Sequence, residues 1–254
     1  MSKIILVTGA TSGFGKAIAI RFAKEGYDII ITGRRMNLLE ELAEQLRQEF
    51  HPNVLSLCFD VRHLKEVETA IGSLAGTWQD IDVLVNNAGL AVGLSSIQEG
   101  IIDDWEWMID TNVKGLLYMT RSVAPIMVKR GQGHIINIGS VAGKEVYPNG
   151  NVYCGSKSAV DAITKGMRID LAPYNIKVTH IAPGAAETEF SLVRFKGDRS
   201  RADKVYQGFK PLAAEDIAEV VYYVTTLPQH VNINDLIIMP TAQANATTIV
   251  RRKT

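Results

Sequence analysis

The sequence predicts an α/β protein with one doubly wound, seven-stranded parallel sheet and helices on both of its faces. Strand-like runs rich in Ile, Val and Leu alternate with helical patterns, which implies parallel pairing through crossover helices. The runs are nearly continuous in apolar residues, as expected when both faces of a sheet are covered. No break in composition marks a linker within the 254 residues, so we expect a single domain over 1–254.

The expected elements follow one another along the whole chain. The strands are expected at 3–9, 27–33, 53–60, 81–89, 133–140, 176–184 and 235–240. The helices between them are expected at 15–26, 37–50, 64–76, 103–130, 152–173 and 213–227. The connection 184–211 is longer and more charged than an ordinary one, so we expect an irregular substrate loop or lid there. The residues from about 241 onward are expected to form a tail beyond the last strand.

Composition argues against several classes of protein. The formal net charge is zero, with 27 basic and 27 acidic residues, which disfavours a general role on nucleic acids or membrane surfaces. No apolar run approaches the roughly 18 residues of a membrane span, and the first one is too short for a signal peptide. Neither Cys58 nor Cys154 belongs to a C-x-x-C or Cys/His cluster, so we expect no disulfide and no metal site. A cytoplasmic protein is the simplest expectation.

The stretch TGATSGFG, between the first strand and the first helix, carries the pattern G-x-x-x-G-x-G. Glycines allow a tight turn and the approach of a pyrophosphate, and the start of the helix offers unpaired N–H groups. The alternative is an ordinary glycine-rich turn, but the position between strand and helix favours a dinucleotide site of the Rossmann type. The cofactor contacts expected in this stretch are Gly9, Thr11, Ser12, Gly13, Phe14 and Gly15.

The end of the second strand indicates which dinucleotide binds. An NAD site usually has an acidic residue there, but this chain has Arg34 and Arg35. Arginines suit the 2′-phosphate of NADP, although they could also be solvated cations at a helix start. Asp60, followed by Val61, ends the third strand. Asp60 either caps the next helix, which is the favoured interpretation, or meets the adenine amino group; both residues are counted as cofactor contacts.

Tyr153 stands four residues before Lys157, which places both on one face of the helix expected at 152–173. A phenol and an ammonium on one face can act together in proton transfer. They can also be two amphipathic side chains with solvated tips. The pair alone does not decide between these interpretations, because such spacing arises by chance in many helices.

Several motifs in a fixed order resemble the short-chain dehydrogenase/reductase family. They are TGATSGFG, NNAG at 86–89, Asn112, GS at 139–140, YCGSK at 153–157 and PG at 183–184. The resemblance spans almost the whole chain. More narrowly, VNNAGLAVG, MIDTNVKGLLYMTR, HIINIGS, VRFKGD and LPQHVNIN are similar to the NADP-dependent 3-hydroxy acid dehydrogenases of this family. That branch oxidises serine, allo-threonine and related 3-hydroxy acids.

The resemblance implies a catalytic role for four side chains. Tyr153 would be the proton donor and acceptor, and Ser140 would hold the substrate oxygen against it. Lys157 would favour the phenolate by lowering the pKa of Tyr153, helped by the charge of the oxidised nicotinamide, and would hold the nicotinamide ribose. Asn112 would bend its helix and hold a water leading to Lys157. Taken alone, Ser140 could be a cap at a strand end and Asn112 a structural amide.

Further contacts are expected at the ends of other strands. The resemblance assigns cofactor contacts to Asn87, Ala88, Gly89, Pro183, Gly184 and Thr188. In the connection 184–211, Arg194 or Lys196 could bind a substrate carboxylate, although a solvated charged surface is an equal alternative. The long helices at 103–130 and 151–173 are expected to form a four-helix dimer contact within a homotetramer, and the tail could dock on a neighbouring copy.

Two other functions remain compatible with the same motifs. One is reduction of another class of carbonyl, such as an acyl-carrier-protein thioester, a sugar or a steroid. The other is a non-catalytic NADPH-binding regulator.

Three further side chains are expected to be structural. Cys154 should fill space beside Tyr153, and His134 and His180 should be core or edge histidines with satisfied hydrogen bonds.

Overall fold

The computed structural model describes residues 2–252 and contains one seven-stranded sheet in which all strands are parallel. The strands are β1 (Ile4–Thr8), β2 (Asp28–Gly33), β3 (Val54–Cys58), β4 (Ile81–Asn86), β5 (Gly133–Ile138), β6 (Ile176–Pro183) and β7 (Asp235–Ile238). Their order across the sheet is β3-β2-β1-β4-β5-β6-β7. The predicted seven strands and their parallel pairing are therefore confirmed.

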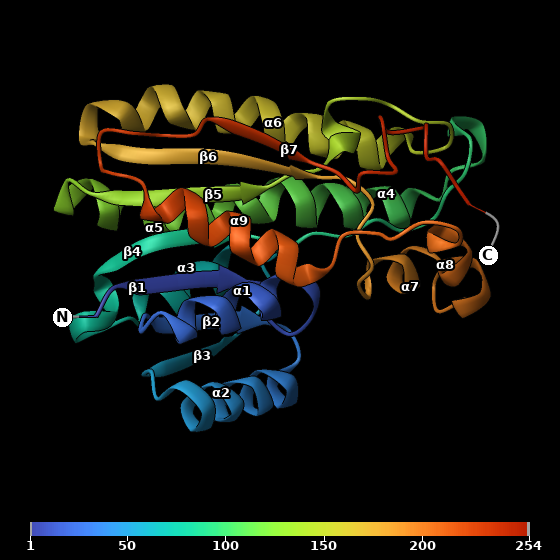
Figure 1. Cartoon of the computed structure of the whole chain (residues 1–254). Coiled ribbons are helices and arrows are strands. Elements are labelled where there is room, and N and C mark those ends of the chain that lie inside the picture. The colour runs from blue at the N-terminus through green and yellow to red at the C-terminus, as the bar shows by residue number, and fades with distance from the viewer. Residues whose placement is uncertain (1, 253–254) are drawn as a thin grey trace.

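Helices cover both faces of the sheet (Figure 1). One apolar core joins the sheet to α1 (Gly13–Lys24), α2 (Met36–Phe50) and α9 (Ala214–Thr226). The other joins it to α3 (Leu64–Gly72), α5 (Leu116–Arg130) and α6 (Asn151–Leu171). Most strand side chains are buried on both faces, which explains their nearly continuous apolar runs. Within the described residues, no helix is both long enough and apolar enough to cross a membrane.

The helix expected at 103–130 is divided. It consists of α4 (Ile102–Ile109), a π-helical turn (Asp110–Gly115) and α5. A π turn inserts one extra residue into the helical ladder, and such turns are frequent at functional sites. Asn112 lies inside it, so the distortion expected around this residue is present.

The connection 184–211 is not irregular, as the sequence led us to expect. It contains α7 (Phe190–Arg194) and α8 (Arg199–Tyr206), which lie beyond the carboxyl ends of the strands (Figure 1). The side chain of Asp198 caps α8 by accepting a hydrogen bond from the Arg201 N–H, a local signal that the sequence contained.

The C-terminal tail contacts its own chain. The Arg252 N–H donates to the Gly208 carbonyl at 2.7 Å, and the Arg251 guanidinium donates to the Val205 carbonyl at 3.0 Å. The tail therefore packs beside α8, near the labelled C-terminus in Figure 1. The docking of the tail on a neighbouring copy stays a prediction.

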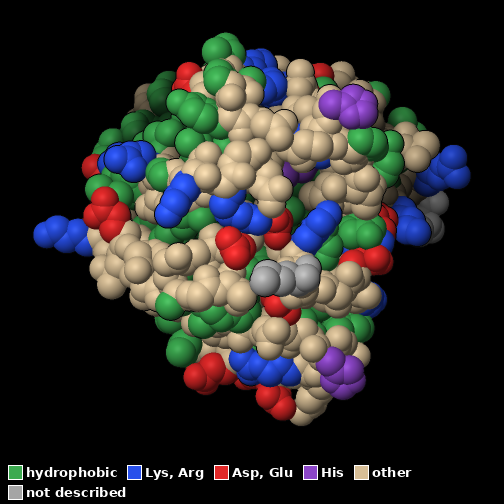
Figure 2. Space-filling model, turned by 90° about the vertical axis from the view of Figure 1, so that its left-hand side faces the viewer, with side chains coloured by type: hydrophobic (Ala, Val, Ile, Leu, Met, Phe, Trp, Pro, Cys, Tyr) green, Lys and Arg blue, Asp and Glu red, His purple; other side chains and the backbone are tan. Residues whose placement is uncertain are grey.

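The face at the amino ends of the strands carries no large field of one sign. Figure 2 shows this face, with Lys and Arg side chains distributed among Asp and Glu. This pattern agrees with the zero net charge of the chain. The functional groups expected from the sequence lie at the opposite end of the sheet, where ligands bind in folds of this kind.

Candidate active site

A cleft of about 570 Å³ opens at the carboxyl ends of the strands. It brings together all but three of the site residues expected from the sequence. Gly15 and Asn112 lie just behind the lining, and Lys196 points elsewhere. The cleft forms beside β1, where the sheet order reverses between β2 and β4.

The glycine-rich turn has backbone conformations that require glycine. Gly9 has φ +66° and Gly13 has φ +52°, both in the left-handed region. A Cβ added to Gly15 would lie 2.3 Å from the Gly9 carbonyl oxygen. The turn therefore leaves the start of α1 open to a phosphate group, which is the arrangement that a dinucleotide pyrophosphate needs.

A buried threonine joins this turn to the end of β4. The Thr8 hydroxyl accepts hydrogen bonds from the Asn87 and Ala88 N–H groups, both at 2.9 Å. The Asn87 amide donates to the Thr8 carbonyl at 2.8 Å. Sequence reasoning missed Thr8, because a threonine within an apolar strand gives no sign that it bonds to a distant loop.

Arg34 and Arg35 line the same end of the cleft but have different partners. Arg35 Nη2 donates to the Thr11 hydroxyl at 2.8 Å and lies 3.4 Å from the Glu189 carboxylate. Arg34 lies 3.8 Å from the Asp60 carboxylate. Both arginines are about half exposed, so their charges remain available to a phosphate.

The favoured interpretation of Asp60 as a helix cap is wrong. Residue His63 occupies the N-cap position of α3, and the carboxylate of Asp60 instead binds the Arg62 guanidinium at 2.7 Å and the Arg62 N–H at 3.0 Å. Partial burial would raise the pKa of Asp60, but these hydrogen bonds outweigh burial and lower it. Asp60 is therefore a charged residue on the cleft lining.

Tyr153 and Lys157 lie on one face of α6, as predicted, and both are buried. Lys157 Nζ donates to the Ile138 carbonyl at 3.0 Å, just before Ser140 at the end of β5. Burial lowers the pKa of Lys157 to about 8. Burial also raises the pKa of Tyr153, although the Ser140 hydroxyl opposes this effect.

The lowering of the Tyr153 pKa by Lys157 stays a prediction, because burial is the largest effect on the pKa of each side chain in this structure. Burial acts on both side chains in the direction that favours their neutral forms. The other charge expected to lower the pKa of Tyr153 is the positive charge of an oxidised nicotinamide.

Ser140 also has the structural role that was its alternative interpretation. Its hydroxyl accepts from the Ala142 N–H at 3.1 Å and caps a short 3₁₀ turn.

Asn112 forms a complete set of structural hydrogen bonds. Its carbonyl oxygen accepts from the Leu90 N–H at 2.8 Å, and its amide donates to the Leu90 carbonyl at 2.8 Å and the Ser156 hydroxyl at 3.0 Å. These bonds fix the loop after β4 against α6. The structural interpretation of Asn112 is thus confirmed, and its relay role stays a prediction.

Arg194 and Lys196, the two candidates for binding a carboxylate, separate in space. The Arg194 guanidinium carbon lies 5.7 Å from the centre of the Tyr153 ring and 5.3 Å from that of Tyr147. Lys196 instead forms an ion pair with Asp104 at 2.9 Å. Only Arg194 faces the buried tyrosine.

Residues 3–197 match the sequence model of the short chain dehydrogenase family. The chain belongs to this short-chain dehydrogenase family. It is 50% identical over 250 residues to the NADP-dependent 3-hydroxy acid dehydrogenase YdfG of Salmonella typhi, covering 98% of this chain and 99% of the relative. It is 48% identical over 245 residues to Sulfoacetaldehyde reductase 2 of Chromohalobacter salexigens, covering 96% of each.

A solved closed form of serine dehydrogenase complexed with NADP⁺ superposes with a TM-score of 0.92. That structure is 49% identical, and the match covers 98% of this chain and 100% of the other. The family resemblance and the fold predicted from the sequence are confirmed by these relatives. Their dependence on NADP agrees with the cofactor expected from Arg34 and Arg35.

Sequence reasoning missed part of the lining of this short-chain dehydrogenase. Tyr147 lies six residues before Tyr153 without belonging to a motif, and Gln243, Ala246 and Ile249 reach the cleft from the tail. The side-chain amide oxygen of Gln243, Oε1, accepts from the Ala185 N–H at 2.7 Å, which fixes the tail to the residues after β6. No local pattern could have indicated that the tail reaches the cleft, because this depends on contacts between segments about 60 residues apart.

The expectations for the cysteines and histidines are met in part. Cys154 is fully buried in an apolar cluster with Tyr153, and both cysteines are free. Each of the two histidines bonds through one ring nitrogen, His134 to Thr179 and His180 to Asp235. Their other ring nitrogens are buried with no hydrogen-bond partner in the described part of the chain, so neither histidine is fully satisfied. Burial lowers the pKa of His134 to about 3.

Proposed function

We propose that this protein is an NADP-dependent dehydrogenase that interconverts a small 3-hydroxy acid and its 3-oxo acid. Serine, L-allo-threonine, 3-hydroxypropionate and 3-hydroxyisobutyrate are the candidate substrates. The observation that carries the proposal is the position of Arg194, whose guanidinium faces the ring of the buried Tyr153. A guanidinium there can bind a carboxylate beside the group that exchanges the proton. The activities named for the 50% and 49% identical relatives support the same assignment.

The residues that would hold NADP lie along the cleft. The glycine-rich turn and Thr188 would bind the pyrophosphate, and Arg34 and Arg35 the 2′-phosphate. The rest of the adenosine would lie against Asp60, Val61, Asn87, Ala88 and Gly89. Lys157 would hold the nicotinamide ribose, and the backbone of Pro183 and Gly184 its carboxamide. When bound, NADP supplies the acceptor or donor of a hydride.

The chain's own residues would handle the substrate and its proton. Ser140 donates a hydrogen bond to the substrate oxygen and holds it next to the Tyr153 hydroxyl. During oxidation the Tyr153 phenolate would take the proton from the substrate hydroxyl, and this proton would then leave to solvent; during reduction the neutral phenol would donate its proton to the substrate oxygen. Arg194 fixes the carboxylate, which limits the orientations of a short acid.

A short sulfonate is the second candidate substrate. A sulfonate presents three anionic oxygens to a guanidinium, as a carboxylate presents two, so Arg194 suits both groups. The 48% identical relative is named for the reduction of sulfoacetaldehyde. A bulky steroid or a carrier-bound thioester is less compatible with a cleft whose outer part is lined by α7, α8 and the tail.

We also propose a homotetramer and a cytoplasmic location. Exposed apolar side chains on α5 and α6, among them Leu117 and Ile169, support contacts between copies through these helices. Light scattering at micromolar concentration tests the assembly, and a monomer would contradict it.

Initial rates test the function. We would compare NADP with NAD, using L-serine, L-allo-threonine, 3-hydroxypropionate, 3-hydroxyisobutyrate and 2-hydroxyethanesulfonate. The proposal expects NADP-dependent oxidation of at least one hydroxy acid and its loss in Tyr153→Phe. Loss of a general acid–base group lowers kcat by about 100- to 10,000-fold. Tyr222→Phe, which alters a tyrosine of α9 outside the cleft, is the control and should keep wild-type rates.

The outcomes separate the candidates. Turnover of the sulfonate alone would favour the second substrate. No turnover of any of these compounds, with NADPH still bound, would contradict the proposal and favour a regulatory role or another carbonyl substrate.

A further inference from the structure

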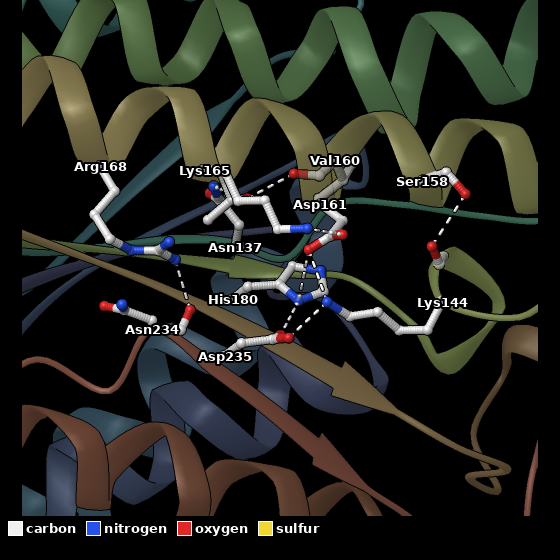
Figure 3. Close-up of polar contacts among 12 residues, drawn as sticks. Asn137, Lys144, Ser158, Val160, Asp161, Lys165, Arg168, His180, Asn234 and Asp235 are labelled. Atoms are coloured by element: carbon white, nitrogen blue, oxygen red, sulfur yellow. Dashed lines mark hydrogen bonds and ion pairs between the residues drawn. The ribbon is translucent and has the colours of Figure 1, made fainter.

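A network of charged groups joins α6, β6 and β7 to Lys144, which lies four residues after Ser140, and its side chains range from the buried His180 to the exposed Asp235 (Figure 3). The Lys144 ammonium lies 2.8 Å from the Asp161 carboxylate on α6 and 2.6 Å from the Asp235 carboxylate on β7. Asp235 also lies 2.7 Å from Nδ1 of His180 on β6, and Asp161 lies 3.8 Å from the same atom. The Lys144 ammonium thus fills the place between two carboxylates where a cation would otherwise bind.

This network contacts the segment Ile138–Lys144 at both ends. The His180 side chain is only 1% exposed, and a Cβ added to Gly139 would lie 2.0 Å from its Nε2 atom. The edge of the imidazole therefore packs directly on Gly139, the residue before Ser140. Lys144, four residues after Ser140, is held by α6 and β7 through its two ion pairs. Ser158 of α6 adds a hydrogen bond to the Gly143 carbonyl at 3.1 Å.

Burial, aided by the charge of Lys144, favours a neutral His180 ring, and Asp235 places its proton on Nδ1. Nδ1 faces the Asp235 carboxylate, so it is the nitrogen that donates, and Nε2 has no hydrogen-bond partner within residues 2–252. Burial is the largest effect and lowers the pKa of His180, the two carboxylates oppose it, and Lys144 lowers it further.

The other groups that face His180 are few. Lys165 pairs with Asp161 at 2.7 Å, and the Arg168 guanidinium lies close enough to interact with both carboxylates. Asn137 of β5, opposite His180 in the sheet, is uncharged. Lys144 is thus the cation that contacts both carboxylates directly.

We propose that Lys144, Asp161, His180 and Asp235 are positioning residues for Ser140. The Lys144 ammonium keeps the carboxylates neutralised and His180 uncharged, so that the bare Nε2 edge can pack on Gly139. Protonation of Nε2 would direct a buried donor at Gly139 and displace the segment that carries Ser140, because a buried donor without an acceptor is unfavourable. This inference rests on the role of Ser140 in the proposed function.

Lys144→Met tests the charge coupling. Loss of the ammonium leaves two carboxylates facing His180, which raises the pKa of the imidazole. Below that raised pKa, His180 is protonated and Ser140 is displaced; above it, the contact with Gly139 is restored. We expect the ratio of variant to wild-type kcat to be about 0.1 or less at pH 6.5 and to return toward one near pH 9, since a displacement of about 1 Å can lower a rate 100-fold.

Two further variants separate charge from folding. Lys144→Arg keeps the positive charge and should have a ratio near one at every pH. Lys144→Met with Asp235→Asn removes one charge of each sign and should regain most of the activity at pH 6.5. Binding of NADPH, measured by its fluorescence, should stay within about twofold of the wild type in all three, because none of these residues lines the cleft.

A spectroscopic measurement is independent of turnover. The histidine ¹³Cε1 resonance of His180, identified by its absence in His180→Asn, should be followed over the whole pH range in which the fold persists. It should titrate at a higher pH in Lys144→Met than in the wild type. Identical His180 titrations in the two proteins, or a kcat ratio for Lys144→Met that is the same at all pH values, would overturn the inference. If the wild type oxidises no hydroxy acid, the proposed function fails, and the titration still decides the charge coupling.

Discussion

The two ends of the cleft differ in the structural elements and in the kinds of side chain that form them. The cofactor end consists of backbone, glycines and buried strands, and its main contacts are hydrogen bonds of the Thr8 hydroxyl and the Asn87 amide. The substrate end consists of α7, α8 and the tail and carries charged side chains, of which Lys196 and Arg251 are exposed and Arg194 is partly buried. The first arrangement leaves little freedom to move, and the second can change when a substrate binds.

Because of this difference, we expect the two ends of the cleft to respond differently to mutation. At the cofactor end, a single added atom meets backbone that cannot move. At the substrate end, a lost charge should change affinity for one class of substrate and leave the fold intact. One ion pair joins the two ends, between Arg35 and Glu189 at 3.4 Å.

The largest effect should come from Gly15→Ala. The added Cβ would lie 2.3 Å from the Gly9 carbonyl oxygen and 2.6 Å from the Asn87 amide nitrogen, so the glycine-rich turn must change shape. We expect the Kd for NADPH to rise at least about 100-fold, which corresponds to roughly 2.7 kcal/mol. Fluorescence titration measures the affinity.

Gly166→Ala on α6 is the matched control, because a Cβ there meets no atom within 4 Å. It should stabilise the fold by about 0.5–1 kcal/mol in thermal unfolding. Wild-type affinity in Gly15→Ala would refute the rigidity of this end.

A smaller effect is expected from Arg35→Ala. One hydrogen bond to a charged phosphate contributes about 1.5–3 kcal/mol, so affinity for NADP should fall roughly 10- to 150-fold. Affinity for NAD, which lacks the 2′-phosphate, should not change. Glu189→Gln is the companion variant: it removes the carboxylate that pairs with Arg35 and should tighten NADP binding severalfold. Calorimetry with both cofactors measures this. An equal loss for NADP and NAD would show that Arg35 acts through folding.

At the substrate end, Arg194→Ala and Lys196→Ala each remove one positive charge and should differ. Arg194→Ala should raise KM for hydroxy acids about 10- to 100-fold, while rates with neutral alcohols stay the same. Lys196→Ala should change KM by less than about threefold, because Lys196 pairs with Asp104 and does not line the cleft. Steady-state rates over a range of acid concentrations measure both. Similar KM values in the two variants would remove the carboxylate-binding role.

The smallest effect should come from the tail. Arg251→Ala removes the guanidinium that donates to the Val205 and Gln207 carbonyls beside α8. Net hydrogen bonds contribute about 0.5–1.5 kcal/mol, so KM for the hydroxy acid should rise about two- to tenfold. Arg252→Ala is the control, since Arg252 contacts Gly208 through its backbone N–H. An equal rise in both variants would mean that the tail acts through its overall charge.

The sequence was most informative where structure depends on neighbouring residues. The strands followed from local apolar runs, and the glycine-rich turn followed from its position between β1 and α1. The end of α3 and the two helices within 184–211 were missed, although Asp198 offered a capping signal. Asp60 was misassigned because its partner, Arg62, competes with the helix start, and a sequence does not show which hydrogen bond is stronger.

The amino-acid sequence by itself determined the sheet, the family, the glycine-rich turn and the pairing of Tyr153 with Lys157 on one helix face, because these depend on periodicity and short-range sterics. Only the tertiary structure decided which of Arg194 and Lys196 faces Tyr153, that the tail returns to its own cleft, and that His180 packs on Gly139 behind Ser140. These depend on burial and on charges that meet across distant segments. Burial is also the largest effect on the pKa of Tyr153 and raises it, because desolvation acts on a side chain according to its depth and not its sequence neighbours.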